Sequence, residues 1–104
     1  MGDQKVVLSL KNAGDKLEKP RQVDHWIYFD TKKDRDKFLE YIKSEKFKIE
    51  EHTGEKKDKN LTAHISRVDK VDLQSIYAIT EHLRKIAAQF KGDYDGWETF
   101  VVKD

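Results

Sequence analysis

Apolar residues recur at helical or strand spacing along most of the chain. Val6, Leu10, Ala13 and Leu17 lie at the spacing of one helical face, which predicts a helix over Asp3–Ala13. Gly14 is placed to end this helix. A polar connector follows, in which Pro20 biases the residue before it away from helix.

The segment Val23–Phe29 is the best predicted strand, because it is rich in β-branched and aromatic residues. Side chains alternate between the two faces of a strand. Val23, His25, Ile27 and Phe29 therefore share one face, and Asp24, Trp26 and Tyr28 share the other. The apolar neighbours of His25 predict a buried core histidine.

Capping residues and alternation predict the remaining elements. Thr31 with Asp34 resembles a capping box, and Asp72 is placed to cap a long helix. The expected elements are a helix over Lys33–Glu45, a strand over Phe47–Thr53, a charged loop over Gly54–Asn60, a strand over Leu61–Val68, a helix over Leu73–Lys91, a turn over Asp93–Gly96 and a strand over Trp97–Val102.

This order is a helix followed by β-α-β-β-α-β, which predicts an α+β fold of the ferredoxin-like plait type. The antiparallel sheet is expected in the order 4-1-3-2, with both main helices on one face. The chain of 104 residues is expected to form a single domain. Within it, residues 1–20 supply the N-terminal helix and connector, and residues 21–104 supply the plait.

Composition restricts the classes of function. The 21 basic and 20 acidic residues almost cancel, so no strongly basic surface for nucleic acid is predicted. The absence of cysteine excludes disulfides and thiolate metal sites. No segment approaches the ~20 apolar residues of a membrane span, and the first residues lack the pattern of a signal peptide. We therefore expect a cytoplasmic protein.

Catalytic chemistry has little support. No serine lies in a Gly-x-Ser-x-Gly elbow, and the isolated glycines form no phosphate-binding loop. Asp93, Asp95 and Glu98 are a candidate cation site, but a turn aspartate beside a solvated strand edge explains them better. The histidines lack zinc-site spacing, and His25 and His64 are expected on opposite faces of the sheet. We therefore expect no enzymatic activity, no metal and no cofactor.

Trp26 and Tyr28 are expected on the sheet face that the two main helices leave uncovered. Aromatic residues at such positions stack on bases in RNA-recognition modules. The preferred interpretation is instead that the N-terminal helix lays Val6, Leu10 and Leu17 over them, with Leu10 contacting Trp26 or Tyr28. Trp97 is a further candidate for this contact.

Several segments together resemble the regulator of ribonuclease E activity B family (RraB-like). Gly14–Leu17 and Pro20–His25 match its Gly-Asp-x-Leu and Pro-Arg-x-Val-(Asp/Glu)-His signatures. Phe38 and the strand start at Lys46–Phe47 match its next helix and strand. Gly92–Thr99 is similar to its closing Gly-x-Tyr-Asp-Gly-Trp-Glu signature. The resemblance covers nearly the whole chain and implies a ferredoxin-like plait.

The resemblance also implies a protein-binding regulator of RNA turnover and not an enzyme, since enteric members bind ribonuclease E and inhibit its RNA cleavage. The expected partner is a protein, a ribonuclease, and RNA binding through the open sheet face is the less favoured alternative. In the closing motif, Asp95 and Gly96 are expected to form a turn, and Arg21 is expected to pair with Asp24. The candidate partner-binding residues are Trp26, Tyr28, His64, Tyr94, Asp95, Trp97 and Glu98.

Overall fold

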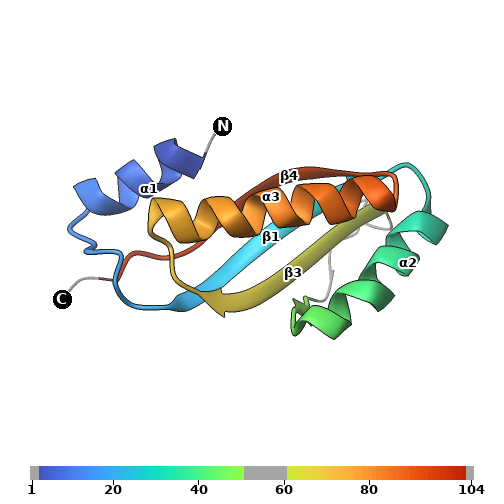
Figure 1. The fold of residues 1–104 in the computed structure, drawn as a ribbon, viewed down its shortest axis with the longest axis horizontal. Coiled ribbons are helices and arrows are strands. Elements are labelled where there is room, and N and C mark those ends of the chain that lie inside the picture. The colour runs from blue at the N-terminus through green and yellow to red at the C-terminus, as the bar shows by residue number, and fades with distance from the viewer. Residues whose placement is uncertain (1–2, 51–60, 103–104) are drawn as a thin grey trace.

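Four strands form one antiparallel sheet, and helices cover one of its faces (Figure 1). The computed structural model describes residues 3–50 and 61–102. Its elements are α1 (Asp3–Asn12), β1 (Arg21–Phe29), α2 (Lys32–Ile42), the 3-10 helix η1 (Lys43–Glu45), β2 (Lys48–Ile49), β3 (Thr62–Asp69), α3 (Leu73–Gln89) and β4 (Gly92–Glu98). The strand order β2-β3-β1-β4 confirms the predicted order and the ferredoxin-like plait.

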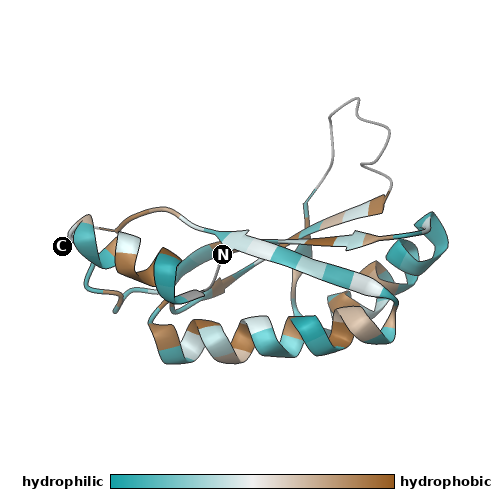
Figure 2. Cartoon of the chain, turned by 90° about the horizontal axis from the view of Figure 1, so that it is seen from above, coloured by the Kyte–Doolittle hydropathy of each residue, from teal (hydrophilic) through white to brown (hydrophobic). Residues whose placement is uncertain are grey.

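Alternation along β1 separates a core face from an open face, as predicted. Val23, His25 and Ile27 are fully buried, whereas Tyr28 on the opposite face is 43% exposed. The buried face packs against α2 and α3, which lie on the same side of the sheet (Figure 2). The core cluster on this side comprises Ile27, Phe29, Phe38, Ile42, Phe47, Ala63, Ile65, Leu83, Ile86 and Ala87.

Both predicted helix caps are present. The Thr31 hydroxyl accepts a hydrogen bond from the backbone N–H of Asp34 at 3.1 Å. The Asp72 carboxylate accepts one from the N–H of Ser75, also at 3.1 Å. These side chains satisfy N–H groups that a first helical turn leaves without partners, so they fix where α2 and α3 begin.

The predicted turn over Asp93–Gly96 is wrong, because these residues already belong to β4. Tyr94 pairs with Ile27 and Gly96 pairs with Trp26, so Asp95 is the extra residue of a β-bulge. Gly96 does not have the positive φ that a turn would use. The strand ends at Glu98 and does not continue to Val102.

The predicted docking of α1 on the open face is also wrong, although Trp97 does lie in one cluster with residues of α1. Val7 and Leu10 are buried in a cluster on the helix-covered side, together with Val23, Val71, Ile76 and Trp97. Figure 1 shows α1 beside the first turns of α3. The docking follows from Trp97, which pairs with His25 and therefore offers its ring on the covered side. Ala13, predicted on the apolar stripe, is exposed.

A buried ion pair fixes the connector after α1. The Arg21 guanidinium binds the Asp15 carboxylate and also donates to the carbonyl of Phe100 at 3.1 Å. The same carboxylate accepts from the N–H of Val102 at 3.0 Å. Arg21 therefore pairs with Asp15 and not with Asp24 as predicted. The pair joins the connector, the start of β1 and the segment after β4.

Some predictions fall outside the described residues. These are the end of the second strand at Thr53 and the loop over Gly54–Asn60.

Candidate functional site

The open face of the sheet is centred on Trp26. This residue pairs with His64 on β3, and the two rings stack with centroids 4.5 Å apart and planes inclined by 18°. The Nε2–H group of His64 donates to the Asp24 carboxylate at 3.1 Å, which fixes the imidazole against the indole. His64 and the core residue His25 lie on opposite faces, as predicted. Tyr28 extends the aromatic surface by one strand repeat.

Carboxylates surround these aromatic rings. Through the strand register, Glu98 lies opposite Asp24 and Asp93 lies opposite Tyr28. Glu50, just after β2, accepts a hydrogen bond from the Ser66 hydroxyl at 2.5 Å. Lys48 pairs with Ser66 and therefore lies on the same face. Among the Lys and Arg residues of the described strands, it is the one on this face. The charged side chains that the described residues place on the open face are therefore mainly acidic, although the whole chain carries a net charge of +1.

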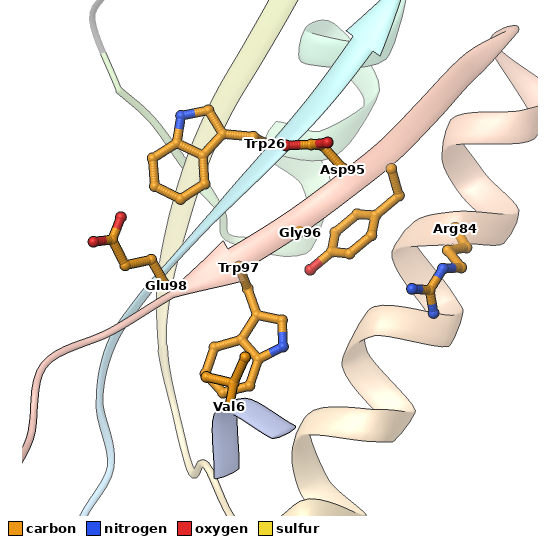
Figure 3. Close-up of a pocket in the computed structure, with 8 residues that line it drawn as sticks. Val6, Trp26, Arg84, Asp95, Gly96, Trp97 and Glu98 are labelled. Atoms are coloured by element: carbon orange, nitrogen blue, oxygen red, sulfur yellow. The ribbon is translucent and has the colours of Figure 1, made fainter. Parts of the chain in front are cut away.

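A cleft of about 290 Å³ follows the outer edge of β4 (Figure 3). Its lining comprises Val6, Trp26, Arg84, Tyr94, Asp95, Gly96, Trp97 and Glu98. Figure 3 shows Trp26, Asp95 and Glu98 on one side of the β4 ribbon, and Val6, Trp97 and Arg84 on the other. The Arg84 guanidinium lies 5.2 Å from the Tyr94 ring centroid and 3.4 Å from the Glu81 carboxylate. The cleft thus joins the acidic open face to the side that carries α1 and α3.

Two of the sequence candidates belong mainly to the core. Trp97 is 9% exposed and packs in the cluster that contains Val7 and Leu10 of α1. The Tyr94 hydroxyl forms a hydrogen bond with His25 Nδ1 at 2.8 Å. The structure therefore brings Trp26, Tyr28, His64 and Glu98 together on the open face, whereas Tyr94 and Trp97 reach the same cleft from the covered side. Asp95 lies on the edge between them.

Titration of His25 is strongly affected by its position beneath the site. Burial, which is the largest cause, and the positive charge of Arg67 together lower the pKa of His25 to about 3. Among the described residues, His25 Nε2 has no hydrogen-bond partner. A neutral, enclosed imidazole of this kind supports Tyr94 and hence one wall of the cleft.

The described part of the chain contains no group of three or more His, Asp or Glu side chains that could hold a metal ion. Asp93, Asp95 and Glu98 therefore do not converge on a common point. Within the same residues, no helix has the length and apolar character needed to cross a membrane.

A family profile described as regulator of ribonuclease activity B matches residues 2–99. The chain belongs to this family. No match was found among curated proteins. Membership confirms the resemblance seen in the sequence and assigns the chain to regulators of ribonuclease activity.

The sequence signatures of the family can now be separated by role. The first signature is architectural, since Gly14 adopts a φ of 98° and Asp15 forms the buried pair with Arg21. This guanidinium and the backbone N–H groups of Val102 and Leu17 hold the pKa of Asp15 well below its usual range. The closing signature instead forms β4, and its residues line the cleft.

Sequence reasoning missed several residues of the site. Asp24 was expected to pair with Arg21, yet it positions His64. Val6 and Arg84 reach the cleft from helices that are distant in the chain, and only tertiary structure places them there. Gly96 was assigned to a turn. Its position opposite Trp26 could have been inferred only by recognising the bulge.

Proposed function

We propose that this chain is a non-enzymatic protein-binding regulator that docks on an endoribonuclease of the ribonuclease E type and modulates its RNA cleavage in the cytoplasm. The observation that carries the proposal is the Trp26–His64 stack, which lies on the open sheet face within a ring of carboxylates. Membership of a family of ribonuclease regulators supports the class of partner.

The composition of the surface supports a protein partner. Aromatic residues near the centre of a patch are typical binding anchors, because they bury a large area with few rotatable bonds. The Asp24 carboxylate and the His64 imidazole hold Trp26 in one orientation, so little conformational entropy is lost on binding. The carboxylates favour a partner that presents Lys or Arg.

The same features disfavour direct RNA binding. RNA-recognition sheets stack bases on exposed aromatic rings and attract phosphates with basic side chains. Here His64 occupies one face of the Trp26 ring. Asp24, Asp93 and Glu98 on the neighbouring strand positions would repel phosphates.

The test is binding of purified ribonuclease E of the same organism to the full chain, with its cleavage of a reporter RNA as a second measurement. Trp26→Ala is expected to weaken binding by about 2 kcal/mol or more, because the anchor is lost. Tyr77→Ala is the matched control, since Tyr77 is 57% exposed on α3 and lies away from the open face.

Thermal unfolding of both variants checks that each remains folded. A wild-type chain that neither binds the ribonuclease nor alters its cleavage would contradict the proposed partner. Equal binding by Trp26→Ala and wild type would contradict the assigned surface.

A further inference from the structure

The outer edge of β4 is available for pairing. β4 is the last strand in the order β2-β3-β1-β4, and no other described strand pairs with its outer side. Figure 2 shows β4 in the foreground, with α3 beneath it and no described element in front of it. An edge strand presents backbone N–H and C=O groups to which an extended segment can add as a further strand.

Gly96 leaves an open space at this edge without a structural need to be glycine. A Cβ atom at Gly96 would meet nothing within 4 Å, and its φ is not in the left-handed region. Gly92, on the same strand, is different, because a Cβ there would lie 2.4 Å from Phe29 Cε2. Glycine inside a strand commonly marks a place where a ligand or another backbone approaches closely. Gly96 is such a place, and Gly92 is required for packing.

The space above Gly96 adjoins the second face of the Trp26 ring. In the sheet, Trp26 lies between its two partners, His64 on β3 and Gly96 on β4. His64 stacks on the indole from the β3 side, so a side chain entering over Gly96 would meet the indole from the β4 side. Asp95 and Glu98 line the cleft beside it. An indole flanked by carboxylates suits a guanidinium, which stacks on the ring and donates hydrogen bonds to the carboxylates.

We propose that an extended, arginine-containing segment of the partner protein adds to the sheet along β4 and places one arginine over Gly96, between the Trp26 ring and the carboxylates of Asp95 and Glu98. This inference rests on the proposed function and names the chemistry of the segment that the surface takes. The cleft volume of about 290 Å³ lies just below the roughly 300–1,000 Å³ of small-molecule pockets, so it suits one inserted side chain better than a cofactor.

A second copy of this chain is the other possible strand donor, and charge argues against it. Pairing of β4 with β4 would bring Asp93, Asp95 and Glu98 of one copy against the same residues of the other. Like charges on directly paired strands are destabilising. A basic segment removes this repulsion and gains attraction.

The experiment is an NMR titration of the isotope-labelled full chain with a short synthetic peptide in which arginine alternates with threonine. We expect shifts at the backbone amides of β4 and at the Trp26 indole N–H. The matched peptide with glutamate in place of arginine is expected to leave these signals unchanged. Shifts confined to α3, or equal binding of the glutamate peptide, would overturn the proposal.

Gly96→Val tests the space itself. Valine favours strand conformation and meets no neighbour at this position, so the variant is expected to remain folded. It should weaken peptide binding by roughly tenfold or more, because its side chain fills the space beside Trp26. Glu98→Gln removes a negative charge at an exposed strand position and should also weaken peptide binding. This variant replaces Gly96→Val in the test if the valine variant is unstable.

The outcomes separate this inference from the proposed function. If the full chain binds the ribonuclease and Gly96→Val binds it equally well, the proposed function is supported and the proposed binding of the segment along β4 is wrong. Sedimentation that reveals a dimer dissociated by Gly96→Val would assign the edge to a second copy and overturn the partner segment. Loss of both peptide and ribonuclease binding in Gly96→Val, with Tyr77→Ala unaffected, supports the proposal.

Discussion

His25 shows how one buried residue couples the core to the candidate site. Its imidazole is fully buried and lies 5.9 Å, centroid to centroid, from the rings of both Phe47 and Tyr94. The hydrogen bond to Tyr94 is compatible with a neutral ring. Protonation would place a charge in this enclosure, which explains why burial is the largest cause of its lowered pKa.

The lowered pKa of His25 predicts loss of stability in mild acid. Its pKa falls from 6.5 in the unfolded chain to about 3 in the fold, so between these values the unfolded state binds the additional proton. Stability from this residue is therefore complete above pH 6.5 and is lost as the pH falls toward 3. The free energy of unfolding should drop by roughly 1.4 kcal/mol per pH unit below 6.5.

Urea unfolding between pH 7 and pH 5 measures this slope before most carboxylates titrate. His25→Phe is expected to abolish the slope, whatever its effect on stability at neutral pH. His82→Gln is the control, since its ring is 51% exposed and contacts Glu45 at the surface. An unchanged slope in His25→Phe would show that another group is responsible.

At the scale of elements, local signals predicted well wherever they agreed with tertiary contacts. The alternation in β1 gave the correct core face, and the Thr31 and Asp72 caps gave correct helix starts. The sheet order followed from topology rules alone. These features depend on residues that are close in sequence, or on the right-handedness of β-α-β crossover connections.

The failures came from features that local sequence does not encode. The dipeptide Asp95–Gly96 is a common turn signal, yet pairing with β1 holds it in an extended bulge. Helical spacing identified an apolar stripe on α1 but could not choose between the two faces of the sheet. That choice depends on Trp97, whose orientation follows from the bulge, because one inserted residue reverses the alternation of β4. The wrong prediction for β4 therefore led to the wrong predicted position of α1.

The position of α1 predicts which tryptophan it protects. Deletion of residues 1–13 removes Val7 and Leu10 from the cluster that contains Trp97. Unfolding free energy is expected to fall by roughly 2–4 kcal/mol, from the apolar area that becomes exposed. In a Trp26→Phe background, the remaining Trp97 should become accessible to acrylamide quenching after truncation.

The reciprocal background, Trp97→Phe, is the control for this deletion. Its remaining Trp26 lies on the open face, so its quenching should change little when residues 1–13 are removed. A large change at Trp26 with none at Trp97 would indicate that α1 covers the open face after all.

At the scale of the whole molecule, net charge conceals an asymmetry. The basic and acidic side chains almost cancel over the chain, yet the charged residues that the described strands place on the open face are mainly acidic. Exposed charges act over about one Debye length, ~10 Å at 0.1 M salt. A docking partner therefore experiences the local acidic field of this face and not the net charge of the chain. This local field selects between the protein-binding and RNA-binding interpretations.

A pair of charge reversals tests this selection. Glu98→Lys places a positive charge on the open face, whereas Glu40→Lys makes the same change in net charge at an exposed position of α2, across the sheet. Glu98→Lys should weaken ribonuclease binding, mainly through a slower association rate, and Glu40→Lys should leave the rate nearly unchanged. The difference between the variants should diminish as salt is raised, since screening removes the field.

The RNA-binding interpretation predicts the opposite effect of Glu98→Lys on affinity, because a lysine on the open face would attract phosphates and strengthen the complex. Surface plasmon resonance with the ribonuclease and with a single-stranded RNA, each at two salt concentrations, distinguishes the protein-binding from the RNA-binding interpretation. Tighter RNA binding by wild type than by Glu98→Lys would contradict both interpretations of the face.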